Sequence, residues 1–327
     1  MQKSLIIFII LLLGCSSKRS AIGEYNVIDV FCSNEDKQLV QPLIDEFFSL
    51  ELNLPQPEKL YSISWHEPHE FSEYTNRHNL MVVSLVNPVD ETGDRLFERI
   101  HNAISSTDSV IAIENMYSLN QIFLGIQSFD AFQLKQQLQN YHNWFYDELN
   151  NTAHNTMIAY AKSKGENSSL SQHILDVFDV DIMIQKDFKF LQDTSEPPFL
   201  WIGRGYPYRW LSFHEVDFDD ISSPDETWVL LEILLESTIG SIEITGDFRS
   251  SEIVKHKSRS VPLLRGNYFH PENDSGGPFF TMFFKKPESG YLLISGFVNY
   301  PGHDKIALIK QLEAIVLDAD IGHSNGN

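Results

Sequence analysis

The sequence predicts an α+β fold with mixed helices and mainly antiparallel sheets, and three observations support this class. Strand-like apolar runs and amphipathic helical segments occur along the whole chain. Hydrophobic residues make up 42% of the 327 residues, which is ample material for a core. Each part of the chain has the rough order strand, helix, strands, helix, which suggests two similar α+β halves, although no sequence repeat supports a duplication.

The first half is predicted to span residues 25–165. Residues 27–32 are typical of a strand, and Ser33 or Asn34 can cap the helix that follows. Pro55 and Pro57 break the chain before a second strand. Further strands are predicted at residues 59–65, 79–86 and 109–114, a polar interval at 90–99, and a kinked helical stretch at 128–164.

The second half is predicted to span residues 166–322, after a surface break at 165–169. Pro224 suits the first turn of a helix. Helices are predicted at residues 170–178, 224–238 and 304–318, and strands at 181–184, 199–206, 279–284 and 291–298. Residues 323–327 are expected to form a disordered tail.

The N-terminus has the pattern of a lipoprotein signal. Lys3 precedes an apolar run at residues 5–13, which is too short to span a bilayer but matches the core of a secretory signal. Gly14 and Cys15 then resemble the lipobox of bacterial lipoproteins, in which the Cys is acylated. We therefore expect a signal peptide at 1–14 and a lipidated tether at 15–24. Because serines and no acidic residue follow Cys15, an outer-membrane location facing the periplasm is expected.

Charge and cysteine content exclude several classes of function. The net charge of −21 argues against nucleic acid as a partner and against electrostatic adhesion to anionic lipid. The bilayer is therefore expected as a partner only through acylated Cys15. With Cys15 modified, Cys32 has no cysteine partner, so a disulfide framework is excluded and a buried, inert thiol is expected.

The segment from Asp274 to Pro278 resembles the motif around a serine-protease nucleophile, with Ser275 in the reactive position. Nucleophilic catalysis would need a histidine base beside Ser275, held by a buried carboxylate. The long helices do not suit a chymotrypsin-like fold, so a Gly-Gly-Pro turn explains the segment more simply. A hydrolase of envelope polymers that uses Ser275 or scattered carboxylates remains the alternative hypothesis.

Neither a metal nor a cofactor is predicted. His66, His69 and His78 lack the spacing of a zinc helix, so solvated loop histidines are expected. The acidic run from Asp217 to Glu226 lacks the glycine of a calcium loop. No Walker lysine motif or complete dinucleotide turn is present.

A candidate binding surface is predicted where aromatic residues lie beside arginine, a combination that is common at recognition sites. The alternative is a strand end whose rings pack on the core. The residues of this candidate surface are Tyr206, Tyr208, Arg209 and Trp210, joined by Arg265, Gly276, Gly277 and Pro278.

Several short segments together resemble a family of bacterial envelope lipoproteins described as domain of unknown function 4837. They are residues 54–58, 206–208, 265–266, 276–279 and 296–298, then Pro301, Lys305 and 311–315. The resemblance implies a lipidated envelope protein and brings no catalytic residue. We therefore expect a non-enzymatic, membrane-anchored lipoprotein that binds an envelope protein or a small ligand.

Overall fold

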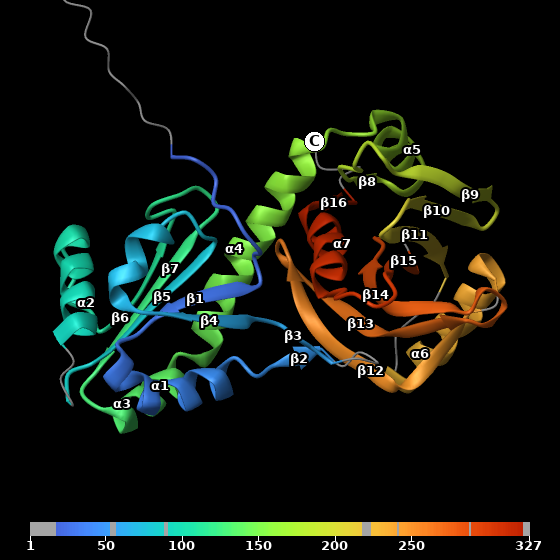
Figure 1. Cartoon of the computed structure of the whole chain (residues 1–327). Coiled ribbons are helices and arrows are strands. Elements are labelled where there is room, and N and C mark those ends of the chain that lie inside the picture. Colours follow the sequence, from blue (N-terminus) through green and yellow to red (C-terminus); the bar gives the residue numbers. More distant parts are fainter. Residues whose placement is uncertain are drawn as a thin grey trace, which may run out of the picture.

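The computed structural model describes residues 18–52, 57–87, 91–217, 224–240, 242–287 and 289–322. The predicted signal peptide at 1–14, the lipidation site Cys15 and the predicted tail at 323–327 lie outside the described residues. The described chain confirms the α+β class, and Figure 1 shows two sheets, each with its own helices. In the described ranges, no helix is long and apolar enough to cross a bilayer.

The first sheet has five strands in the order β4-β1-β5-β7-β6. Strands β4, β1, β5 and β7 are parallel neighbours, and β6 runs antiparallel to β7. Every residue of the central strand β5 is buried, as expected for a strand covered on both faces. The strands are β1 (Val27–Phe31), β4 (Ser62–His66), β5 (Asn79–Leu85), β6 (Val110–Glu114) and β7 (Ile122–Ser128).

Helices cover both faces of this sheet (Figure 1). Helices α1 (Asn34–Phe47) and α3 (Ala131–Asn140) share a core with one face, and α2 (Glu91–Ile104) packs on the other. The polar interval predicted at 90–99 lies mostly in α2, a helix that the sequence analysis did not predict. Phe97 and Ile100 bury one side of α2, while its other residues keep the segment polar on average.

The second sheet has seven strands in the order β12-β13-β14-β15-β11-β10-β9, and all neighbours are antiparallel. Helix α6 (Pro224–Ile239) shares a core with one face, and α7 (Ile306–Asp318) with the other. The strands are β9 (Lys189–Ser195), β10 (Pro198–Arg204), β11 (Tyr208–Val216), β12 (Glu243–His256), β13 (Arg259–His270), β14 (Ser275–Lys285) and β15 (Tyr291–Asn299).

Small elements complete the two halves. The first half also contains the two-stranded sheet of β2 (Glu51–Leu52) and β3 (Glu58–Lys59), and the 3-10 helix η1 (Pro68–Glu73). The second half adds α5 (Ser168–Phe178), the sheet of β8 (Val180–Asp181) and β16 (Asp320–Ile321), and η2 (Pro271–Asn273).

Helix α4 (His142–Ser163) belongs to the cores of both halves. Phe145 and Leu149, near its start, pack in the core under the five-stranded sheet. Met157 and Ala161, near its end, pack with α7 in the core of the seven-stranded sheet. The predicted kink lies at Tyr141, where α3 ends and α4 begins. One continuous helix therefore joins the two cores, and Figure 1 shows it crossing between them.

The two halves do not repeat one topology, so the structure does not support the suspected duplication. The first sheet is mostly parallel, and the second is antiparallel with a different number of strands. Parallel neighbours need helical crossovers, whereas antiparallel neighbours can be joined by short turns. The two halves therefore have a roughly similar order of elements but different sheets, one mostly parallel and one antiparallel.

Candidate functional site

A cleft of about 600 Å³ lies between the two halves, and both contribute to its walls. Helix α4 and the chain around Tyr61 form the wall from the first half. Helix α7 and the hairpin of β12 and β13 form the wall from the second half. Because binding sites occur preferentially between domains, and this volume suits a small molecule, the cleft is the leading candidate site.

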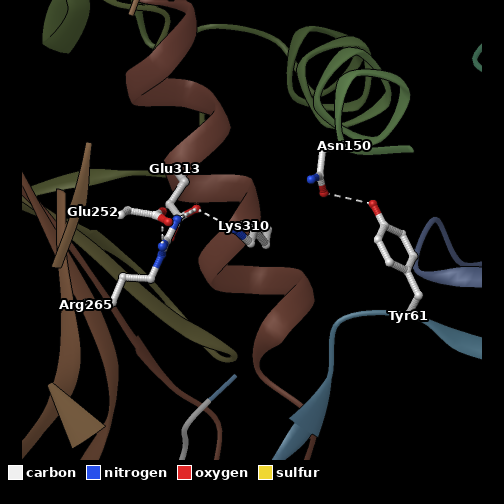
Figure 2. Close-up of polar contacts among 6 residues, drawn as sticks. All are labelled: Tyr61, Asn150, Glu252, Arg265, Lys310 and Glu313. Atoms are coloured by element: carbon white, nitrogen blue, oxygen red, sulfur yellow. Dashed lines mark hydrogen bonds and ion pairs between the residues drawn. The ribbon is translucent and has the colours of Figure 1, made fainter. Parts of the chain in front are cut away.

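The second-half wall carries a four-residue ion network, drawn in Figure 2. Arg265 on β13 donates through Nε and Nη2 to the two carboxylate oxygens of Glu313 on α7, at 2.6 and 3.1 Å. It also donates through Nη1 to Glu252 on β12. Lys310, three residues before Glu313 on α7, donates to Glu313 Oε2 at 3.0 Å. The network therefore ties α7 to the hairpin that it covers.

Glu313 keeps its charge although its side chain is buried. Burial by itself raises the pKa of Glu313, but the positive charges of Lys310 and Arg265 and their hydrogen bonds lower the pKa to about 2. Burial would lower the pKa of Arg265, yet Glu313 and Glu252 raise it above its ordinary value. Both groups are therefore ionised at neutral pH, and each is held by its partners.

The opposite wall presents hydrogen-bonding groups from one face of α4, and all of them except Asp147 are neutral. The cleft is lined by Asp147, Asn150, Asn151 and His154, whose spacing of three, four and seven residues places them on one helix face. The Tyr61 hydroxyl donates to Asn150 Oδ1 at 2.9 Å (Figure 2). Burial raises the pKa of Tyr61, so this phenol stays a neutral hydrogen-bonding group.

His154 is neutral at physiological pH because burial, as the largest effect, lowers its pKa. Asp318 opposes that change and Lys162 adds to it. The imidazole therefore offers the cleft one donor and one acceptor rather than a positive charge.

The charges around the cleft are balanced. Its described lining contains three acidic residues (Asp147, Glu252, Glu313) and three basic residues (Lys255, Arg265, Lys310). The whole chain, by contrast, carries a net charge of −21. No serine, threonine or cysteine is among those described lining residues, so the cleft has none of these nucleophiles.

Direct contacts join the two halves next to residues that line the cleft. The buried carboxylate of Glu58, on β3, accepts hydrogen bonds from the backbone amides of Lys305 and Ile306, each at 2.7 Å. The Tyr25 hydroxyl donates to the backbone carbonyl of Ala307 at 2.5 Å. Both groups of the first half thus contact the first turn of α7.

The structure divides the residues of the predicted candidate surface among four places. Tyr206 and Tyr208 are exposed, and the Tyr208 ring stacks on Trp210 with centroids 5.7 Å apart and planes at 8°. Arg209 points to the other side of β11, because neighbouring residues of a strand face opposite ways. It is buried and donates to Gln311 on α7, so it is not part of the exposed aromatic group.

Arg265 and the Gly276–Pro278 segment lie apart from that aromatic group. Arg265 lines the interdomain cleft, whereas Gly276, Gly277 and Pro278 line a separate cavity of about 360 Å³. A Cβ atom at Gly276 would lie 2.5 Å from the carbonyl oxygen of Tyr268. A Cβ atom at Gly277 would overlap the carbonyl oxygen of Val298. Close strand packing therefore explains both glycines.

The hydrolase hypothesis gains no support at Ser275. This residue begins β14, where its backbone is paired in register with His270, and the hydrogen bonds of His78, His214 and His256 go to other groups. Ser275 also lies outside the lining of the interdomain cleft. A serine nucleophile needs such a base within reach.

The histidines from the metal hypothesis are separated in the fold. His66 was expected in a solvated loop, but it ends β4, is largely buried and contacts Asp29 at 2.8 Å. His78 contacts the backbone carbonyl of Asn120, and burial lowers its pKa. His69 is exposed and contacts Glu67. Within the described chain, no group of three or more His, Cys, Asp or Glu side chains is placed to hold a metal.

Sequence reasoning found Arg265 and missed the rest of the cleft. Two signals were present in the chain. Glu313 stands in the otherwise apolar segment 312–316, where a charge requires a partner. The polar residues of α4 recur at helical spacing from Asp147 to His154, which marks one face of a helix.

Comparisons with known proteins identify two domain families. Residues 166–317 match the family described as Domain of unknown function (DUF4837), which confirms the family named from the sequence, although residues 54–58, also quoted for that resemblance, lie outside the match. Residues 21–162 match the family described as Domain of unknown function (DUF8532). No curated protein matches the chain. The crystal structure of LpqN, involved in cell envelope biogenesis of Mycobacterium tuberculosis, shows 15% identity and a TM-score of 0.26, over 44% of this chain and 83% of LpqN.

Proposed function

We propose that this chain, which carries a DUF4837 domain in its second half and a DUF8532 domain in its first, is a lipid-anchored binding protein of the cell envelope. Its ligand occupies the cleft between the halves and is a neutral molecule rich in hydroxyl or amide groups, such as a sugar. The protein releases this ligand unchanged.

The observation that carries the proposal is the polar face of α4. Asn150 and Asn151 are exposed and line the cleft, together with the neutral imidazole of His154. Amide and imidazole groups supply paired donors and acceptors, which match hydroxyl and amide groups of a ligand. Asparagine side chains on one face of an isolated helix would form a solvated surface. Here they face the wall that the second half contributes to the cleft.

Charge balance favours a neutral ligand. Arg265, Glu313 and Lys310 already satisfy one another, so the cleft offers no unpaired buried charge from this network to attract an ion. An anion or a cation would have to compete with those internal pairs, whose charge-assisted hydrogen bonds are strong. A neutral ligand can bind beside the pairs without breaking them.

Cys15 supports the location. Two or more acyl chains anchor a protein stably, whereas one chain binds only marginally. The serines that follow Cys15 favour the outer membrane, with the body facing the periplasm. The acylated cysteine would thus hold an acidic protein at a surface that its net charge does not favour.

Ligand binding can be tested by calorimetry with chitotetraose as a neutral probe, and with citrate and spermidine as charged probes. We expect binding of chitotetraose alone. Asn150→Ala and Asn151→Ala should each raise its Kd at least tenfold, and Asn151→Ala leaves the Tyr61 hydrogen bond intact. Asn155→Ala is the matched control, because Asn155 is exposed on α4 and does not line the cleft. Preferential binding of a charged probe, or no binding of chitotetraose, would overturn the proposed ligand class.

The anchor is tested separately. Mass spectrometry of the mature protein should find acyl groups on Cys15, and a Cys15→Ser variant should leave the membrane fraction. A Cys15→Ser protein that fractionates with membranes as fully as the parent would contradict lipid anchoring, whatever the calorimetry shows.

A further inference from the structure

The first described residues, 18–22, are bound to the body of the first half. The Lys18 ammonium donates to the backbone carbonyls of Asn115 and Met116, at 2.5 and 3.0 Å. The Leu119 amide donates to the carbonyl of Arg19 at 2.9 Å, and the Ala21 amide donates to the carbonyl of Leu119 at 2.8 Å. The sequence had predicted a polar tether through residue 24, but the chain is attached from Lys18 onward.

This attachment leaves very little chain between the lipidation site and the body. Only Ser16 and Ser17 lie between Cys15 and Lys18, so three residue steps join them, and a fully extended chain spans at most about 3.6 Å per step. Cys15 therefore lies within about 11 Å of Lys18, whatever the conformation between them. The headgroup region on each side of a bilayer is roughly 5–8 Å thick. An acylated Cys15 at the hydrocarbon boundary would thus place the surface around Lys18 at the headgroups.

We infer that this surface is a membrane-docking face, which we define by Lys18, Arg19, Ile22, Arg77 and Leu119, and that its partner is the phospholipid headgroup layer that holds Cys15. The inference rests on the lipidation proposed above. It adds that the protein stands on the bilayer in one orientation and does not hang from a long flexible tether.

The composition of the docking face suits a lipid headgroup layer. Ile22 and Leu119 are 53% and 44% exposed, although both are large apolar side chains. Lys18 and Arg19 are exposed beside them, and the backbones of Ile22 and Arg77 form a parallel bridge. Apolar side chains can enter the interface, while the cations are attracted to an anionic lipid surface.

Acidic residues near this face moderate its charge. Glu24, Glu73 and Glu114 are exposed. Each lies close in the sequence to a residue of the docking face, namely Ile22, Arg77 and Leu119 respectively. Even so, three cations in this small area contrast with the whole chain, where 45 acidic residues outnumber 24 Lys and Arg residues. The docking face is therefore a place where the acidic protein can approach anionic lipid.

The orientation has a consequence for the rest of the molecule. In Figure 1 the chain enters at the top of the first half, and α6 lies at the lower end of the second half. Docking through residues 18–22 therefore directs α6 away from the bilayer.

The test uses the lipidated full-length protein, first verified by mass spectrometry and then reconstituted in phosphatidylethanolamine and phosphatidylglycerol nanodiscs. Leu119→Cys is labelled with an environment-sensitive fluorophore, and Ile253→Cys, 66% exposed on β12, is the matched control. Neither Cys32, which is buried, nor the thioether of acylated Cys15 competes for the label. Nitroxide-bearing lipids should quench the label at residue 119 at least twofold more than the label at residue 253.

The outcomes separate the two proposals. Equal quenching at residues 119 and 253 in protein that carries the lipid would overturn the docking face and leave lipid anchoring intact. Absence of the lipid from Cys15 would overturn both. As a second measurement, Arg19→Glu should reduce quenching at residue 119 in anionic nanodiscs, since it replaces an exposed cation and leaves the hydrogen bonds of the Lys18 side chain in place.

Discussion

Glu58 Oε2 lies 2.7 Å from the backbone nitrogen of Ile306, so a carboxylate of the first half caps a helix of the second. The residue at the N-cap position of α7, Lys305, makes no side-chain capping bond of its own. The first amides of a helix need partners from outside the helix, and its N-terminus favours negative charge. The Glu58 carboxylate supplies both a hydrogen-bond acceptor and a negative charge, and the cap therefore couples the two halves.

Replacing Glu58 should weaken this coupling. We expect Glu58→Ala to lower the free energy of unfolding by about 2 kcal/mol, because two helix amides lose a charged acceptor. Glu58→Gln should cost less, since its carbonyl can still accept. Urea denaturation measures both, with Glu98→Ala on the exposed side of α2 as the control. A Glu58→Ala protein as stable as the control would show that the cap contributes nothing.

Removing the cation from the cleft network should be costly. Arg265→Met leaves Glu313 buried with Lys310 as its remaining partner, so we expect a loss of about 3 kcal/mol in the free energy of unfolding. The double variant Arg265→Met/Glu313→Met removes both buried charges and should lose less than the single variant. Chemical denaturation of all three proteins gives this comparison. A double variant less stable than Arg265→Met would refute the argument from an unpaired buried charge.

The same network should make stability depend on acid pH. The pKa of Glu313 is about 2 in the folded protein and about 4.3 in an unfolded chain, so the unfolded state binds the proton first as the pH falls. Its contribution, on the order of 3 kcal/mol, is fully present above about pH 5 and is lost as the pH falls towards 2. The stability gap between wild type and Glu313→Gln should therefore narrow from pH 6 to pH 3, as measured by denaturation at each pH. A constant gap would contradict the lowered pKa.

Gly277 should be intolerant of a side chain. A Cβ atom there would overlap the Val298 carbonyl oxygen on β15, and backbone cannot move aside as a flexible side chain can. We expect Gly277→Ala to lower the free energy of unfolding by about 3 kcal/mol. Gly205→Ala is the matched control, because nothing lies within 4 Å of a Cβ at that position, and it should stay within about 0.5 kcal/mol. Equal thermal midpoints for the two variants would disprove the steric explanation of the Gly-Gly pair.

Strong local patterns carried most of the correct predictions about the fold. The apolar run at 79–86 contains the buried strand β5. The helix predicted at 304–318 is α7, which begins two residues later, at Ile306. The sequence pattern did not predict the hairpin of β12 and β13, because its long strands mix charged and apolar residues. That hairpin supplies Arg265 and Glu252 to the cleft, so the sequence named Arg265 without the wall to which it belongs.

The sequence by itself determined the α+β class, the DUF4837 resemblance and the segments that are helical or extended, because these depend on residues close together in the chain. Only the tertiary structure decided that Arg209 and Arg265 bind different partners, Gln311 and Glu313, because strand register sets the face on which a side chain lies. It also decided that the polar face of α4 borders a cleft and not open solvent. A periodic pattern marks which face of a helix is polar, but the wall opposite that face comes from residues about 100 or more positions away in the chain.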